Sequence, residues 1–295
     1  MAALYEVVER PELVDPVLVV GLDGWIDAGL AAAAATAHLL DVLSTTVVAT
    51  FDADTLVDHR SRRPVLHLVD GVNTGLTWPA IELRHGRDAE GHDVLLLVGA
   101  EPDVRWREFS TAVAALARDL GVGLVTGFGA YPAPIPHTRP GRIATTATSP
   151  ELAARAGQVR TTVDVPAGAL GAIERACADI GLPAVGLWAQ VPHYVSAMAF
   201  PAAAALLVDG LARLTGLQLD SEPLHDAGRA LATRLDALVA DNPEHVEMVR
   251  ALEASVDAEA SDAGPITAVD LPSGDELAAE LQRFLREVDR GDGGS

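Results

Sequence analysis

Residues 17–22 read Val17-Leu18-Val19-Val20-Gly21-Leu22, an unbroken apolar run with the length of one buried strand. A glycine-rich turn follows at residues 24–29, and an alanine-rich segment at residues 30–43 has the composition of a helix. A strand without polar alternation is buried on both faces, which is typical of a parallel sheet covered by helices. This stretch therefore predicts the first strand and the first helix of an α/β fold.

The same alternation of apolar runs and helical segments continues through the first two thirds of the chain. Further strands are expected at residues 47–51, 65–69, 80–84, 92–99, 122–126 and 184–189, and further helices at residues 106–120, 172–180 and 201–214. The polar, glycine-rich residues 70–75 are expected to form a turn. The pattern predicts a mostly parallel sheet with helices on both faces.

Beyond residue 217 the strand-like runs stop, and the chain becomes helical and acidic. A pair of helices is expected at residues 222–239 and 243–256, followed by a polar linker up to residue 272. A capping box at residues 273–276 then predicts a last helix, whose apolar stripe must bury against its own core or a neighbouring subunit. We expect an α/β domain at residues 1–217 and an acidic helical extension at residues 218–295.

Composition excludes several classes of partner. The formal net charge of −21 opposes binding to nucleic acids and to anionic membranes. No apolar run approaches the roughly 20 residues of a membrane span, and the first residues lack the features of a secretion signal. The single cysteine, Cys177, forms no internal disulfide and is expected to be a small core residue. We expect a soluble cytoplasmic protein.

All 21 basic residues are arginine, which excludes lysine-dependent chemistry such as Schiff-base formation or a phosphate-binding loop lysine. Two explanations stay open: a GC-rich genome, or avoidance of lysine-targeted tagging by a protein that works beside a protease.

The glycines at 127 and 129 precede prolines rather than a helix, so they do not form a dinucleotide site. The nine histidines lack metal-ligand spacing. No cofactor and no metal are expected.

Residues 130–149 form the segment with the highest local proline content, with four prolines between Tyr131 and Pro140. We expect an ordered loop there, neither helix nor interior strand, because proline lacks the backbone donor that both structures need. Ordered loops that follow the strands of α/β proteins commonly carry their sites. His137 and Arg139 in this loop are therefore candidate site residues.

The loops at the carboxyl ends of the predicted strands gather the other candidates. The candidate binding residues are Trp25, Asp27, Asp52, Asp54, Glu101, Asp103, Trp106, Tyr131, His137 and Arg139. Asp27, Glu101, His137 and Arg139 in one enclosed pocket could perform acid–base hydrolysis. The same groups could instead form a network that fixes the loops, with Asp27 capping the helix after it and the aromatic residues suited to a protein interface.

Three of these stretches resemble the proteasome assembly chaperone 2 family, in its actinobacterial branch. They are Gly24-Trp25-Ile26-Asp27-Ala28-Gly29, Gly99-Ala100-Glu101-Pro102-Asp103-Val104-Arg105-Trp106 and Pro136-His137-Thr138-Arg139-Pro140. The order of elements agrees over residues 17–214. The resemblance implies a three-layer α/β/α sandwich of the phosphorylase/hydrolase-like kind that forms homo-oligomers, with trimers expected. Eukaryotic and archaeal relatives help proteasome α subunits assemble or bind the assembled core.

Three functions stay open at this point. The first is a non-enzymatic, self-associating chaperone or adaptor whose partners are further copies of itself and proteasome core subunits. The second is a small-molecule hydrolase or phosphorylase that uses the loop carboxylates with His137 and Arg139. The third is a scaffold that recruits a basic partner through the acidic helices.

Proteasome-docking relatives tend to end in a hydrophobic residue, then tyrosine, then one more residue. This sequence ends Asp292-Gly293-Gly294-Ser295, so docking by such a tail is not expected.

Overall fold

The predicted first strand lies at the centre of an eight-stranded sheet. The computed structural model describes residues 4–24, 26–157 and 163–261, and in it β2 spans Val17–Asp23. The strand order is β1-β3-β6-β7-β2-β8-β10-β9. The other strands are β1 (Tyr5–Val7), β3 (Thr46–Phe51), β6 (Ile81–Arg87), β7 (Asp93–Ala100), β8 (Leu124–Ala133), β9 (Ile143–Ala147) and β10 (Ala184–Pro192).

Only the middle of this sheet is parallel. The neighbours β7, β2, β8 and β10 run in the same direction, whereas the pairs β1/β3, β3/β6, β6/β7 and β10/β9 are antiparallel. The prediction of a mostly parallel sheet is therefore wrong. The buried apolar runs identified the parallel centre, but the short edge strands β1 and β9 carry no such run, so their pairing could not be read from pattern.

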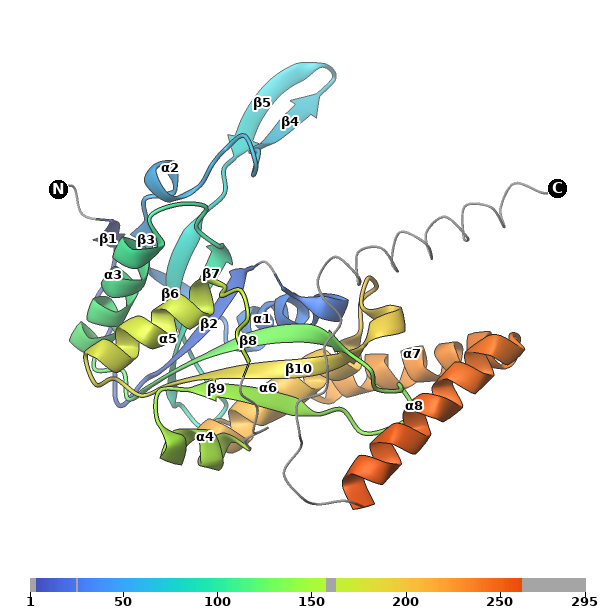
Figure 1. Ribbon diagram of the computed structural model, residues 1–295. Coiled ribbons are helices and arrows are strands. Elements are labelled where there is room, and N and C mark those ends of the chain that lie inside the picture. The colour runs from blue at the N-terminus through green and yellow to red at the C-terminus, as the bar shows by residue number, and fades with distance from the viewer. Residues whose placement is uncertain (1–3, 25, 158–162, 262–295) are drawn as a thin grey trace. The chain divides into compact units, whose positions relative to one another are not determined.

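Helices cover both faces of the sheet, as predicted. One core contains Val19 of β2 with side chains of α1 (Ala31–Val42) and α6 (Pro201–Thr215). The other core contains Leu18 and Val20 with side chains of α3 (Trp106–Asp119) and α5 (Ala169–Asp179). Successive residues of a strand point to opposite faces, so the unbroken apolar run supplies both cores. The result is the predicted three-layer α/β/α sandwich (Figure 1).

Short helices and a helical pair complete the described chain. They are η1 (Ala28–Leu30), α2 (Ala53–Leu56), α4 (Pro150–Ala156), η2 (His193–Val195), α7 (Glu222–Ala240) and α8 (Pro243–Ser261). The predicted pair at 222–239 and 243–256 is confirmed, although α8 continues to Ser261, into residues that were predicted to begin a linker. Buried Leu235 of α7 belongs to the same core as α6. The predicted capping box and last helix lie outside the described residues. None of the described helices combines the length and apolar character of a transmembrane span.

The proline-rich segment departs from its predicted loop. β8 continues to Ala133 and pairs with β10 as far as Ala133 opposite Pro192, and β9 forms an edge strand after the remaining loop. Pro132 is tolerated because β2 accompanies β8 only as far as Gly127, apart from one isolated bridge between Asp27 and Ala130. One edge of β8 is thus largely unpaired where proline occurs, and an unpaired edge does not need the missing donor.

A separate two-stranded sheet is formed by β4 (Val65–Val69) and β5 (Val72–Thr77). The six-residue turn predicted at 70–75 is wrong, because the chain reverses over Asp70 and Gly71 alone. Both residues have positive φ, 51° and 81°, as a two-residue hairpin turn requires. Figure 1 shows the hairpin extending away from the eight-stranded sheet.

Candidate functional site

Asp27 caps the first helix of the sandwich. Its carboxylate accepts hydrogen bonds from the backbone N–H groups of Ala32 at 2.7 Å and Ala33 at 2.9 Å, near the start of α1. These amides belong to the first turn and have no partner within the helix. The capping interpretation is confirmed. Trp25, its neighbour in the predicted site, lies outside the described residues.

Glu101 ties the end of β7 to the start of α5. Its side chain is buried and accepts a hydrogen bond of 2.5 Å from the backbone N–H of Ala169. The backbone N–H of Glu101 in turn donates to the carbonyl of Asp23 at the end of β2. Burial raises the pKa of the Asp23 carboxyl and nearby Asp27 adds to this, whereas Arg62 opposes it. This edge of the sheet thus holds one carboxyl with raised pKa, a property shared by many catalytic acids and by many structural groups.

Asp52 and Asp54 organise the short helix α2. Asp52 accepts hydrogen bonds from the backbone N–H of Thr55 at 3.2 Å and from its hydroxyl at 2.5 Å, so it is the N-cap of this helix. Asp54 is exposed and pairs with His59 at 2.9 Å. Both carboxylates serve local structure.

Asp103 and Trp106 fix the loop after β7. Asp103 accepts a hydrogen bond of 2.8 Å from the backbone N–H of Asp58 and lies 3.5 Å from the guanidinium of Arg62. The Trp106 indole N–H donates to the carbonyl of Pro102 at 2.5 Å. Asp103 therefore joins the loop after β7 to the segment that follows α2.

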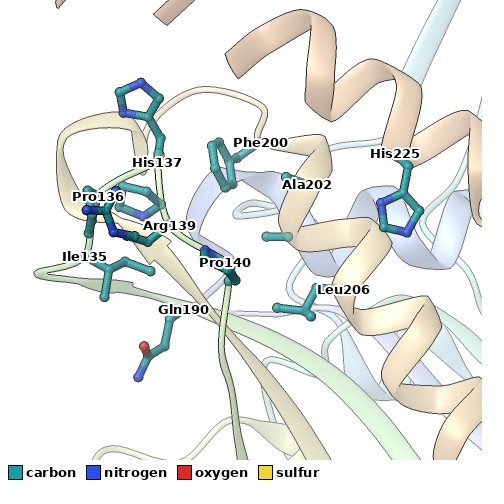
Figure 2. A pocket seen from close by; sticks show the side chains of 13 residues that line it. Ile135, Pro136, His137, Arg139, Pro140, Gln190, Phe200, Ala202, Leu206 and His225 are labelled. Atoms are coloured by element: carbon teal, nitrogen blue, oxygen red, sulfur yellow. The ribbon is translucent and has the colours of Figure 1, made fainter. Parts of the chain in front are cut away.

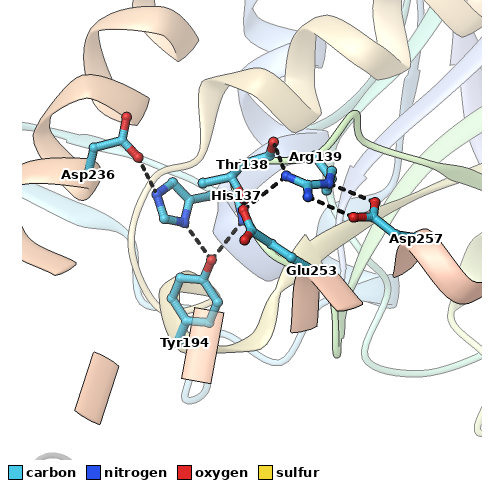
Figure 3. A network of polar contacts seen from close by, with 7 residues as sticks. All are labelled: His137, Thr138, Arg139, Tyr194, Asp236, Glu253 and Asp257. Carbon is cyan, nitrogen blue, oxygen red and sulfur yellow. Dashed lines mark hydrogen bonds and ion pairs between the residues drawn. The ribbon is translucent and has the colours of Figure 1, made fainter. Parts of the chain in front are cut away.

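The side chain of His137 is enclosed, with 1% of its surface exposed. Its Nε2 lies 3.2 Å from Asp236 of α7, and its Nδ1 lies 2.6 Å from the hydroxyl of Tyr194 in η2 (Figure 3). The backbone N–H of His137 also donates to that hydroxyl at 2.7 Å. Because an ionised carboxylate only accepts, Nε2 carries the proton and Nδ1 accepts from Tyr194. Both ring nitrogens are therefore engaged within the protein.

Arg139 is held by two carboxylates of α8. Its guanidinium binds Asp257 through two hydrogen bonds of 2.8 Å and Glu253 through one of 2.9 Å (Figure 3). The Thr138 hydroxyl donates to the same Glu253 at 2.5 Å. These contacts raise the pKa of Arg139, and its hydrogen bonds lower the pKa of Asp257. A bidentate arginine–carboxylate pair is a strong and directional contact.

The acidic helices thus pair with the proline-rich loop, a contact that the sequence does not predict. Arg142, three residues after Arg139, forms a further pair with Glu259 of α8 at 2.7 Å. The signal was present in the sequence: a loop with one histidine and two arginines, and a helix with acids at 253, 257 and 259. Nothing in the sequence, however, indicates that segments more than 110 residues apart meet.

A cavity of about 260 Å³ lies between this loop, α6 and α7 (Figure 2). Its lining is mostly apolar and includes Ile135, Pro136, Pro140, Phe200 and Leu206, with His137, Arg139, Gln190 and His225 as polar members.

Gln190, which lines the cavity, has a buried polar atom without a partner in the described part of the chain. Its Nε2 donates to the Tyr131 hydroxyl at 2.9 Å, while its buried Oε1 has no hydrogen-bond partner among the described residues. Burial raises the pKa of Tyr131. Asp27 and Glu101 are not among the residues that line this cavity. The cavity therefore unites two of the four residues that the enzyme hypothesis requires and leaves out the other two.

Two further buried groups lie in α5. Cys177 is fully buried, and burial together with Glu174 raises the pKa of its thiol to about 12, so the expected core role is confirmed. Burial raises the pKa of Glu174 itself to about 7, although its carboxyl accepts a hydrogen bond of 2.8 Å from Thr146 of β9. The sequence gives no signal for Glu174, because its position in a helix does not show that an edge strand covers it. Within the described part of the chain, no cluster of three His, Cys, Asp or Glu side chains could hold a metal ion.

Comparison with solved structures shows the same fold in proteins of similar sequence. A Corynebacterium glutamicum protein of unknown function is 32% identical with a TM-score of 0.84, over 89% of this chain and 100% of its own. A Mycobacterium tuberculosis proteasome-assembly chaperone homologue is 35% identical with a TM-score of 0.73, over 79% of this chain and 99% of its own.

A more distant structure shares the fold alone. The Pyrococcus furiosus protein PbaB, an archaeal proteasome activator, is 18% identical with a TM-score of 0.61, over 79% of this chain and 97% of its own. A comparison with curated protein sequences finds no match. The model of the PAC2 family matches residues 21–239, which is most of the chain and includes all three stretches that carried the resemblance. The protein therefore belongs to the PAC2 family.

Proposed function

We propose that the protein is a non-enzymatic, self-associating chaperone or adaptor that binds proteasome core subunits in the cytoplasm. A chaperone-like role follows from the family, since similar proteins include a proteasome-assembly chaperone homologue and, at greater distance, an archaeal proteasome activator. Self-association, the absence of catalysis and the proteasome partner are the proposal. No nucleic-acid or membrane partner belongs to it.

One observation carries the proposal: the polar groups of the proline-rich loop form hydrogen bonds and ion pairs with other parts of the same protein. His137 has both ring nitrogens bonded, and Arg139 is held by Glu253 and Asp257. A general base must lie within hydrogen-bond reach of the proton it removes, and among the described side chains the ring of His137 reaches Tyr194 and Asp236 of its own chain. A loop whose histidine and arginine are fixed to α7 and α8 is better suited to present a rigid surface than to transfer protons.

The surface that this loop presents is largely apolar. The cavity beneath it, about 260 Å³ in volume, is lined by Ile135, Pro136, Pro140, Phe200 and Leu206. A pocket of this size accommodates one large apolar side chain, and such anchors dominate the energetics of many protein interfaces. We propose that this pocket receives an apolar side chain of the partner.

We further propose that residues 218–295 act as an acidic extension of the α/β domain at residues 1–217. Asp236, Glu253, Asp257 and Glu259 of α7 and α8 hold the proline-rich loop in place. The acidic helices then shape the pocket rather than recruit a basic partner.

Affinity capture after mild cross-linking, from a proteasome-bearing actinobacterium, tests the partner. Proteasome core subunits should be recovered, and failure to recover any would contradict the proteasome part of the proposal.

A substitution tests the pocket itself. With purified subunits, Leu206→Asp should weaken binding by about tenfold or more because it puts a charge into the apolar pocket. Leu238→Asp is the matched control, since Leu238 is exposed on α7 and does not line the pocket. Equal binding by both variants would contradict the assignment of the pocket.

A further inference from the structure

His225 of α7 is a polar residue in the lining of the cavity beneath the proline-rich loop. Its Nε2 lies 2.9 Å from Oδ2 of Asp209 in α6, and the hydroxyl of Ser221 donates to the other oxygen of that carboxylate at 2.6 Å. Two contacts therefore fix the carboxylate. Because the carboxylate holds one nitrogen of the His225 ring, it also sets the direction of the other nitrogen.

The tautomer of His225 follows from this contact. An ionised carboxylate only accepts hydrogen bonds, so Nε2 carries the proton and Nδ1 of the neutral ring holds a lone pair. Nδ1 has no hydrogen-bond partner among the described residues, and 40% of the side chain is exposed. His225 thus offers an oriented and accessible acceptor to a group that enters the cavity.

The other polar residues of the lining differ from His225. His137 uses both of its ring nitrogens within the chain, and Arg139 is held by carboxylates of α8. Gln190 has a buried acceptor, its Oε1, without a partner among the described residues. The acceptors on Gln190 and His225 therefore favour an occupant that brings a hydrogen-bond donor.

The acceptor of His225 lies at one end of an apolar space. Figure 2 shows Ile135 and Pro136 of the loop at one side of the cavity and His225 at the other. An occupant that spans this space has its apolar body against the loop and its polar end at His225. The volume of about 260 Å³ limits the occupant to one large side chain.

Tyrosine is the side chain that combines these properties. It carries a hydroxyl donor at the far end of a flat apolar ring, and Phe200 in the lining offers that ring an aromatic contact. Phenylalanine and leucine lack the donor, whereas lysine and arginine bring a charge that an apolar cavity disfavours. A site that hydrogen-bonds a hydroxyl rejects the analogue without it, because the site's own polar group would stay unpaired.

We propose that His225 makes the cavity selective for a tyrosine side chain of the partner, whose hydroxyl donates to Nδ1. Asp209 is the positioning residue that sets the tautomer and direction of the ring. This inference rests on the proposed function, in which the cavity receives an apolar side chain of a partner, and it names the kind of side chain.

The side-chain analogues of tyrosine and phenylalanine, p-cresol and toluene, test this selection on the full chain without a partner protein. Nuclear magnetic resonance follows the titration, with dissociation constants taken from the methyl groups of Leu206 in the lining. The Nδ1 resonance of His225, identified by its loss in His225→Phe, should shift with p-cresol and stay in place with toluene.

The ratio of p-cresol affinity to toluene affinity measures the hydrogen bond itself. This ratio should be about fivefold higher in the wild type than in His225→Phe, which keeps an aromatic ring but has no acceptor. His245→Phe is the matched control, because His245 is exposed on α8 and does not line the cavity. It should keep the wild-type ratio.

Asp209→Asn tests the positioning role and keeps the ring of His225. An amide N–H that faces Nε2 makes this nitrogen the acceptor and moves the ring proton to Nδ1. The Nδ1 resonance should then move to the range of a protonated nitrogen, and the preference for p-cresol should fall toward that of His225→Phe. This variant decides the question if His225→Phe does not fold, which far-UV circular dichroism would show.

Three results would overturn the inference: equal affinity ratios in the wild type and His225→Phe, a p-cresol complex with an unchanged Nδ1 resonance, or no binding of either probe. An unchanged preference and tautomer in Asp209→Asn would overturn the role of Asp209. None of these measurements involves a proteasome subunit. Their failure is therefore distinguishable from failure of the affinity capture, which contradicts the proposed partner instead.

Discussion

The proline-rich loop and the β4–β5 hairpin with Trp78 (residues 65–78, here called the arm) are both additions to the sandwich, and their side chains differ in kind and in exposure. The loop carries polar groups, and each is bonded to the protein's own helices, His137 to Asp236 and Arg139 to Asp257. The arm carries apolar groups, and Leu66 and Leu68 remain 47% and 59% exposed. The difference teaches that charged, motif-like residues can be structural, while a plain apolar hairpin can be the better candidate for binding.

The largest expected effect comes from breaking the loop at its buried histidine. His137→Ala should lower the free energy of unfolding by about 2–3 kcal/mol, because it removes two side-chain hydrogen bonds and leaves the Tyr194 hydroxyl without the ring nitrogen that accepts its proton. Chemical denaturation of both proteins measures this. His245→Ala, an exposed histidine on α8, is the control and should change stability by no more than about 0.5 kcal/mol. Equal effects of the two substitutions would contradict the structural role of His137.

A smaller effect is expected from Arg139, whose pairs are partly exposed. Arg139→Gln should loosen the loop from α8, because glutamine has no charge to share between Glu253 and Asp257. Limited proteolysis should then cut the chain near residue 139 faster than in the wild type. Arg234→Gln, an exposed arginine of α7, should leave the rate of cleavage unchanged. A loop equally resistant in both variants would mean that Arg139 does not hold it.

Low pH should weaken the ion pair between Arg139 and Asp257. The pKa of Asp257 is lowered by its hydrogen bonds to Arg139, so the pair stabilises the folded state above the ordinary aspartate pKa of 3.8. This contribution is lost as the pH falls through the lowered pKa of the folded state. Denaturation curves between pH 7 and pH 2 should therefore show a steeper loss of stability in the wild type than in Arg139→Gln. Parallel pH profiles of the two proteins would contradict the pairing.

The smallest effect on the fold should come from the arm. Leu68→Ser should change the free energy of unfolding of the dilute protein by no more than about 0.5 kcal/mol, because Leu68 is largely exposed and packs against no core. Leu97→Ser, a buried leucine of β7, is the contrast and should destabilise by several kcal/mol. A large effect of Leu68→Ser in dilute protein would mean that the arm packs within its own chain.

The sandwich could be predicted because its evidence is local. The run at residues 17–22 fixes β2 and both cores, since three successive apolar residues face alternate sides of the sheet. The edge strands β1 and β9 could not be predicted, because their positions depend on strands far along the chain. The turn at Asp70 and Gly71 was missed because Asn73, Thr74 and Gly75 of β5 have the composition of a turn.

In the candidate site too, contacts between nearby residues could be predicted and contacts between distant residues could not. Asp27 was understood as a cap because the helix that it caps begins a few residues away. His137 and Arg139 were recognised as important, but their partners lie 99 and 118 residues away, and the sequence does not show such contacts. The binding roles of Asp52, Asp54, Glu101, Asp103, Trp106 and Tyr131 stay predictions. The domain boundary at residue 217 also stays a prediction, which limited proteolysis would test.

Hydrogen–deuterium exchange at two protein concentrations compares the loop and the arm in a single measurement. The backbone N–H of His137 is bonded to Tyr194 within the chain, so its protection should be the same at low and high concentration. The arm, which spans β4 and β5, should exchange rapidly in dilute protein and become protected as the concentration rises. Protection of the arm that does not depend on concentration, or protection of the loop that does, would contradict the contrast between a loop fixed within its own chain and an arm that its own chain leaves exposed.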